Sequence, residues 1–352
     1  MPAFVEDVFK FGEKVLDKLT FPVDDGVWVV YPSAGYGKRS GFEAGVMPVY
    51  SWRENGFENR KVNTLALLMQ GSVKGDFRFM NDIEYFHKDK WRVDSRIDWF
   101  KGYDIYRKLN SNNSVDDKTR YSLKRRGASA EFLTRLSFSS GVHIGGELYA
   151  YHYDLDISDI TTNVKGLYGG FVSGIGPVFM YDSRNHNLAP SSGFFLRGGV
   201  LVYDNLWFSD FDFVEYYFDI RQFNSVLGNS VLGFQYIYNY TSNDAPFFKL
   251  PELGGKDRMR GIGYSRWIVD KHIQMVRGEL RFPVWWRFGG VFFTETGFAG
   301  DSFSAIYDDL MLTCGLGLRF RIHPREPLNI RFDAGFTSDG QSGFFVTLRE
   351  AF

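Results

Sequence analysis

The stretch Trp91-Arg-Val-Asp-Ser-Arg-Ile-Asp-Trp99 alternates strictly between two kinds of side chain. Its odd positions are mostly apolar or aromatic, and its even positions are charged: Arg92, Asp94, Arg96 and Asp98. Successive side chains of a β-strand point to opposite faces, so this period of two predicts a strand with one apolar and one charged face. A similar division recurs in residues 76–86 and 232–240.

The composition fits strands that cross a membrane. The 352 residues include 20 Tyr and 36 Phe, which favour strands and membrane interfaces. The mean hydropathy of −0.24 is low, but a transmembrane barrel keeps its average low because only one face of each strand is apolar. The net charge of −1 gives no electrostatic reason to expect a nucleic-acid partner. A single cysteine, Cys314, excludes an internal disulfide.

A soluble β-sandwich also has alternating strands, but its apolar faces must meet in a core while its polar faces meet solvent. Here the polar face carries many charges of opposite sign. A water-filled lumen is the simpler environment for such a face, so the pattern predicts an all-β outer-membrane barrel.

Sixteen antiparallel strands are expected in this barrel. Their approximate ranges are 27–38, 41–52, 61–72, 75–87, 90–101, 120–138, 141–154, 165–183, 192–204, 211–224, 229–241, 271–283, 286–299, 307–323, 326–337 and 342–352. An even number is typical of bacterial single-chain barrels. If the N-terminus is periplasmic, the long connections 102–119, 155–164 and 242–270 all lie on the outer side, as this class requires.

The chain divides into a short N-terminal segment, 1–26, and a barrel, 27–352. Residues 3–19 have apolar side chains at helical spacing and predict an amphipathic helix. Two interpretations stay open: a helix at the periplasmic interface or barrel opening, or a short tether. Acidic residues interrupt its apolar stretch, so it is not a signal peptide. We therefore expect a mature sequence whose leader has been removed.

The last segment, Ser342-Gly-Phe-Phe-Val-Thr-Leu-Arg-Glu-Ala-Phe352, also alternates. One predicted face holds Phe344, Val346, Leu348 and Phe352. A terminal Phe on an alternating strand resembles the signal by which bacterial outer-membrane barrels are recognised for assembly. Glu350 departs from the apolar residue expected on that face.

Four further segments occur in the order of the motifs of one family. They are Tyr181-Asp-Ser-Arg-Asn-His-Asn-Leu-Ala-Pro-Ser-Ser-Gly193, Leu253-Gly-Gly-Lys-Asp-Arg-Met-Arg-Gly-Ile262, Glu279-Leu-Arg-Phe-Pro283 and Phe292-Phe-Thr-Glu-Thr-Gly297. They resemble a turn, a loop and two strands of the BamA/TamA superfamily, also called the bacterial surface antigen family. In the turn the matching residues are Asp182, Arg184, Pro190 and Gly193. Ile262 stands where the family has an aromatic residue, and Glu295 replaces the commoner aspartate.

The resemblance implies that the sixth outer loop folds into the lumen and that its arginine pairs with an acidic residue of the wall. These positions correspond to Arg260 and Glu295. Gly254, Gly255 and Gly261 would let the loop turn sharply without Cβ clashes. The charged face of 276–282 adds Arg277, Glu279 and Arg281 to the lumen. The alternative is that Arg260 lies on a solvated loop.

The family resemblance implies a role in outer-membrane protein assembly or polypeptide translocation. Expected partners are outer-membrane lipid and lipopolysaccharide, client barrel proteins and other outer-membrane complex subunits. Residues 1–26 are too few for a POTRA domain, so a POTRA-less member or a barrel excised from a longer protein is expected. A passive pore, and a docking subunit or membrane anchor, are the alternatives. No cofactor, metal or enzymatic activity is expected, because no nucleophile, phosphate-loop or metal motif appears.

Overall fold

The part of the chain that the structure describes is almost entirely β-strand. The structure is a computed structural model, and it describes residues 18–352 apart from 24, 38, 54–61, 89, 110–114, 137–140, 158–163, 187–188, 243, 265, 267, 303–309, 322–328 and 349. Within these residues, seventeen strands belong to one sheet and two form a small separate pair.

The strands follow one another as antiparallel neighbours in chain order. The first ten are β1 (Thr20–Val23), β2 (Gly26–Gly37), β3 (Gly41–Trp52), β4 (Asn63–Ser72), β5 (Phe77–His87), β6 (Trp91–Leu109), β7 (Val115–Arg135), β8 (Val142–Asp156), β9 (Gly169–Asp182) and β10 (Gly193–Tyr203). The others are β11 (Phe213–Val226), β12 (Ser230–Thr241), β13 (Glu252–Leu253), β14 (Ile268–Val269), β15 (His272–Trp285), β16 (Phe288–Gly300), β17 (Met311–Arg321), β18 (Asn329–Thr337) and β19 (Ser342–Leu348). Short 3-10 turns occupy Asn205–Trp207, Leu227–Asn229 and Phe247–Lys249.

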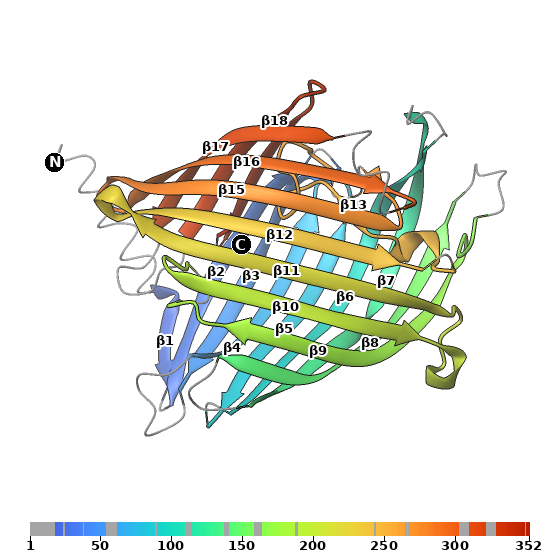
Figure 1. Cartoon of the computed structure of the whole chain (residues 1–352), viewed down its shortest axis with the longest axis horizontal. Helices are drawn as coiled ribbons and strands as arrows, with labels where there is room; N and C mark the ends of the chain where they lie inside the picture. Colours follow the sequence, from blue (N-terminus) through green and yellow to red (C-terminus); the bar gives the residue numbers. More distant parts are fainter. Residues whose placement is uncertain are drawn as a thin grey trace.

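The sheet is strongly curved around a central space, which we call the lumen. Figure 1 shows β10, β11, β12 and β15 across the front of the molecule, with β2 to β7 behind them. The last strand, β19, lies beside β2. The molecule is therefore an all-β, barrel-like sheet.

Each of the sixteen expected strands corresponds to one strand of this sheet, but the sheet contains a seventeenth, β1. Four residues are too few to show an alternation, which is why the sequence did not reveal it. The outer connection expected at 102–119 is also shorter in the structure than predicted. The strand β6 continues to Leu109 and β7 begins at Val115, and these two residues face each other across the hairpin.

The N-terminal helix expected at residues 3–19 lies outside the described residues, except for Lys18 and Leu19. Within the described part of the chain, no helix combines the length and the apolar character that crossing a membrane requires.

The two faces of the wall differ as the alternation predicts. In β15, the side chains of Val276 and Leu280 are 47% and 37% exposed, whereas Arg277 and Glu279 are buried. In β17, Leu316 is exposed while Arg319, on the opposite face, is buried. Apolar side chains therefore cover the outside, and the charged side chains gather in the lumen.

Where β8 ends and β11 begins, aromatic side chains fill the lumen. Tyr151, Tyr153, Tyr203 and Phe213 from the wall pack with Phe247 and other side chains in one buried cluster. Because Phe247 belongs to the connection between β12 and β15, this cluster fixes that connection inside the barrel.

Candidate functional site

The connection between β12 and β15, residues 242–271, folds into the lumen. Its side chains Leu253, Met259 and Ile262 are fully buried, and they pack against Ile237 of β12 and Met275 of β15 among others. The short strands β13 and β14 pair with each other within it, and Figure 1 places β13 inside the curve of the sheet. This apolar contact removes these three loop side chains from solvent and positions the tip of the loop.

Arg260 stands at that tip with no exposed surface. Its Nε lies 2.8 Å from Oε1 of Glu295 on β16. Its Nη1 lies 2.8 Å from Oε2 of Glu279 on β15 and 3.0 Å from Oδ2 of Asp333 on β18. The guanidinium carbon lies 3.5 Å from the centre of the Phe293 ring. One loop side chain therefore joins three strands of the wall.

These neighbours stabilise the charged form of Arg260. Burial lowers the pKa of its guanidinium, but Glu279, Glu295 and Asp333 more than offset that effect and hold the pKa above its ordinary value. A buried cation without such partners would be costly, because its desolvation has to be compensated. A lysine offers a single point charge in place of the planar fork that reaches three carboxylates here.

Glu295 serves a second buried arginine as well. Arg277 Nε lies 2.9 Å from the same Oε1 of Glu295. Arg277 also donates from Nη2 to the carbonyl oxygen of Asp257 in the loop at 2.7 Å, and from Nη1 to the carbonyl oxygen of Ala351 at 3.4 Å. Arg277 thus holds the wall, the loop and the C-terminal segment together.

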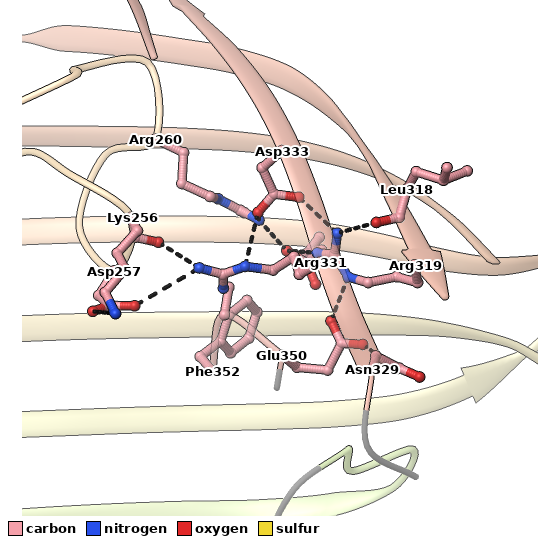
Figure 2. A network of polar contacts seen from close by, with 12 residues as sticks. Lys256, Asp257, Arg260, Leu318, Arg319, Asn329, Arg331, Asp333, Glu350 and Phe352 are labelled. Carbon is pink, nitrogen blue, oxygen red and sulfur yellow. Dashed lines mark hydrogen bonds and ion pairs between the residues drawn. The ribbon is translucent and has the colours of Figure 1, made fainter. Parts of the chain in front are cut away.

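Figure 2 shows that this network extends to β17 and β18. Arg319 lies 2.6 Å from Asp333 and 2.7 Å from Glu350. Arg331 lies 3.2 Å from Asp333 and donates to the loop carbonyl of Lys256 at 3.0 Å. Five arginines thus meet four buried or nearly buried carboxylates: Arg260, Arg277, Arg281, Arg319 and Arg331 with Glu279, Glu295, Asp333 and Glu350.

Arg319, Arg331 and Asp333 were not among the predicted site residues. A signal was available, because these residues occupy the same alternating face as Thr313 in β17 and Asn329 in β18. Glu350, which looked out of place in the predicted last strand, accepts hydrogen bonds from Arg319 and, at 2.6 Å, from Asn329 Nδ2. Its side chain belongs to the lumen network.

The C-terminal Phe352 does not share an outward face with Phe344. Phe344 is 52% exposed, but Phe352 is buried. Its ring stacks on Phe223 of β11 with centroids 5.6 Å apart, and its main-chain oxygen accepts a 3.0 Å hydrogen bond from Arg281. The expected placement was wrong because β19 ends at Leu348, so the strand alternation does not continue to residue 352.

The turn between β9 and β10 holds the four residues that match the family motif. Arg184 donates to both carboxylate oxygens of Asp182, at 2.9 and 3.1 Å. Gly193 has φ of +108°, and a side chain there would overlap the carbonyl of Ser183. The carbonyl of Pro190 accepts a hydrogen bond from Arg281 at 3.3 Å. The turn is therefore tied to the lumen network through Arg281.

Arg281 also connects the remaining predicted lumen charges. Its Nε donates to Oε1 of Glu279 at 2.7 Å. Because Glu279 contacts Arg260 as well, the predicted loop arginine and the three predicted lumen charges of β15 form one continuous set of ion pairs with Glu295.

Two loop glycines carry the backbone geometry that the tip requires. Gly254 and Gly255 have φ of +128° and +81°, a region that L side chains rarely adopt. Gly261 has no such φ, but a Cβ there would lie 2.7 Å from the Cγ2 atoms of both Thr313 and Thr337. Gly261 therefore lets the loop tip approach β17 and β18.

Gly261→Ala is expected to lower the free energy of unfolding by about 1–3 kcal/mol, because the added methyl group overpacks the contact between loop and wall. Urea unfolding in detergent micelles measures this. Gly146→Ala is the matched control, since a Cβ there meets only the carbonyl of Gly176 at 3.7 Å. Equal stability of the two variants would contradict the tight approach at Gly261.

Charge pairs also line the other part of the lumen. Arg197 of β10 lies 3.1 Å from Glu147 of β8 and contacts Glu131 of β7. A cavity of about 220 Å³ remains here, lined by Arg197, Lys249, Tyr217 and other polar side chains. The inserted loop borders this polar space, because Lys249 and Arg258 belong to its lining.

Comparison with known proteins gives a family and a fold. The Omp85 superfamily domain matches residues 58–344. The structure of BamA from Haemophilus ducreyi lacking POTRA domains 1–3 is similar at a TM-score of 0.62 and 13% identity, over 91% of this chain and 69% of that one. CdiB from Acinetobacter baumannii is similar at 0.57 and 12% identity, over 92% and 59%. No curated protein sequence matches the chain.

Proposed function

Because the chain belongs to the Omp85 superfamily, we propose that it acts in outer-membrane protein assembly or polypeptide translocation. In this proposal residues 27–352 form a barrel of the bacterial outer membrane that closes between β2 and β19, and residues 1–26 form its tether. Other polypeptides enter or cross the membrane where this closure opens. The family membership and the fold support an outer-membrane protein; the activity is our inference.

The observation that carries the proposal is the short last strand. The strand β19 has seven residues, whereas its neighbour β2 has twelve. Beyond Leu348 the chain leaves the wall, and Phe352 lies in the lumen against β11. Part of β2 therefore has no partner from β19. A strand edge presents N–H and C=O groups that can pair with another strand, so this junction is the natural place for a client strand to add.

The inserted loop supports the same mechanism by bracing the wall next to the junction. Arg260 ties β15, β16 and β18 together through buried carboxylates. The backbone of its tip also presses on β18 and β19, since a Cβ at Gly335 or Gly343 would overlap the main chain of Arg260. We infer that these strands stay in place while the edge of β2 becomes available.

The proposed partners follow from the two faces of the wall. The apolar outer face would contact outer-membrane lipid and lipopolysaccharide, and the edge of β2 would contact client barrel proteins. Other subunits of an outer-membrane complex could bind the connections between strands. The loop that fills the lumen weighs against a passive pore. Affinity capture from native membranes distinguishes an assembly role from that of a docking subunit or membrane anchor.

A cross-link across the junction tests the mechanism. Gly35 of β2 lies beside Val346 of β19, because a Cβ at Gly35 would stand 3.5 Å from the carbonyl oxygen of Val346. Ala34 and Val346 share the outer face, since each is two residues from an exposed aromatic side chain, Tyr36 and Phe344. We expect Ala34→Cys and Val346→Cys, bridged by a short bifunctional maleimide in a Cys314→Ser background, to abolish insertion of a model barrel protein into liposomes that contain the full chain.

The unbridged double variant is the control and should keep full activity. The bridge does not touch the Arg260 network, so barrel stability should be unchanged or raised. Full insertion activity in the bridged protein would rule out opening between β2 and β19.

A further inference from the structure

The first described strand, β1, covers one part of the edge of β2. Its residues Thr20–Val23 pair with Val29 to Gly26 in antiparallel register. The N–H of Val30 adds a hydrogen bond to the carbonyl oxygen of Leu19 at 2.9 Å. The chain's own N-terminal segment therefore occupies the edge of β2 from Gly26 to Val30.

If β19 continued beyond Leu348, it would pair with this same part of the edge of β2. Val346 lies beside Gly35, and residue numbers run in opposite directions along two antiparallel strands. Six residues beyond Val346, Phe352 would therefore lie close to the level of Val29, which is six residues before Gly35 and within the part of β2 that β1 covers. Because the chain turns into the lumen after Leu348, this place is left to β1.

The strand β1 is short and exposed, so it can detach from β2. It has only four residues, and Phe21 and Val23 are 51% and 48% exposed, so little apolar surface holds it in place. Pro22 has no N–H to offer on the free side of β1, which makes β1 a poor template for further strands. By contrast, the edge of β2 beneath it offers a regular row of main-chain groups.

Side chains next to this edge indicate what kind of strand fits. The rings of Trp28 and Tyr50 stack with centroids 5.0 Å apart, and Tyr50 stacks on Trp52 at 5.1 Å. This aromatic row ends at Trp28, opposite Phe21 of β1. An incoming extended strand with an aromatic or large apolar side chain at that position would continue the row, since cross-strand aromatic pairs stabilise a sheet.

We propose that β1 occupies the edge of β2 until an extended strand of another polypeptide, apolar on one face, displaces it and pairs with Gly26–Val30. We call β1 in this role the placeholder. This inference rests on the proposed function and deepens it, because it names the segment that guards the edge. The strand β1 then acts as an autoinhibitory contact that keeps the edge from pairing with unsuitable strands.

A reversible lock tests the placeholder. Since Val30 donates to Leu19, the pair Thr20 and Val29 occupies the non-hydrogen-bonded position, where close Cα atoms suit a disulfide. Thr20→Cys with Val29→Cys, in a Cys314→Ser background, fixes β1 when oxidised and frees it when reduced. The probe is a fluorescent peptide copying residues 342–352, which alternates apolar and polar side chains, and its binding to the full chain in detergent micelles is followed by anisotropy.

We expect the reduced protein to bind the peptide at least tenfold more tightly than the oxidised protein. The single variant Thr20→Cys should bind equally under both conditions. Equal binding by the oxidised and reduced double variant would overturn the placeholder.

Liposome insertion of a model barrel protein by the same two samples separates this inference from the proposed function. Binding that depends on the lock, without any insertion in either state, would refute the assembly function and leave the placeholder standing. Insertion that is equal in both states would refute the placeholder and leave the assembly function standing.

Discussion

Arg260→Ala is expected to lower the free energy of unfolding by about 3–5 kcal/mol, because it removes the cation from a buried ion-pair cluster. The variant leaves the carboxylates of Glu279, Glu295 and Asp333 in the lumen without their shared partner. Each carboxylate keeps an arginine of the wall: Arg277 at Glu295, Arg281 at Glu279 and Arg319 at Asp333. Among the loop residues that the structure describes, however, Arg260 alone forms ion pairs with these carboxylates, so its loss releases the loop from the wall. Urea unfolding in micelles and heat-modifiable gel mobility measure the loss.

The control is an arginine in a similar pair that solvent reaches. Arg96 pairs with Asp82 at 2.6 Å, but its side chain is 52% exposed. Arg96→Ala should cost no more than about 1 kcal/mol, as exposed ion pairs contribute little. Arg260→Lys should lie closer to the alanine variant than to the parent, because lysine cannot reach three carboxylates at once. Unchanged stability in Arg260→Ala would mean that the loop is held by its apolar contacts alone.

Strand alternation explains how much of the fold was predictable. The charged residues of β15 and the apolar residues between them predicted the direction of each side chain, because a wall between lipid and water fixes the face of every residue. The same alternation carries Arg319 and Asp333 to the lumen. The contact of Asp333 with Arg260 depends on the curvature of the sheet, which brings distant strands together and leaves no signal in a single strand.

The ends of the chain were less predictable for a related reason. The short strand β1 and the inward turn after Leu348 both depend on which backbone groups of β2 find a partner. An alternating sequence shows that residues 342–352 can form a strand, but not where the strand leaves the wall. Glu350 was the one visible sign, since a carboxylate on a lipid-facing position is costly, and in the structure it contacts Arg319.

Phe352→Ala is expected to lower the free energy of unfolding by about 3–5 kcal/mol, the usual cost of removing a buried phenyl ring. The ring is 6% exposed and fills the space above Gly233, where a Cβ would lie 3.2 Å from it. The guanidinium carbons of Arg277 and Arg281 each lie 5.2 Å from its centre. Truncation therefore removes apolar burial and two cation–π contacts together.

The measurement that matters is refolding from urea into detergent without any assembly factor. If Phe352 only marked the chain for assembly, its substitution would not change stability under those conditions. If its ring is packed in the lumen, the substitution lowers stability. Phe344→Ala is the matched control, because Phe344 belongs to the same final segment but is 52% exposed. We expect the control to stay within about 1 kcal/mol of the parent, since exposed side chains lose little on truncation. If both variants unfold at the parent's urea concentration, the lumen contacts of Phe352 add nothing to stability, and its role lies in recognition during assembly.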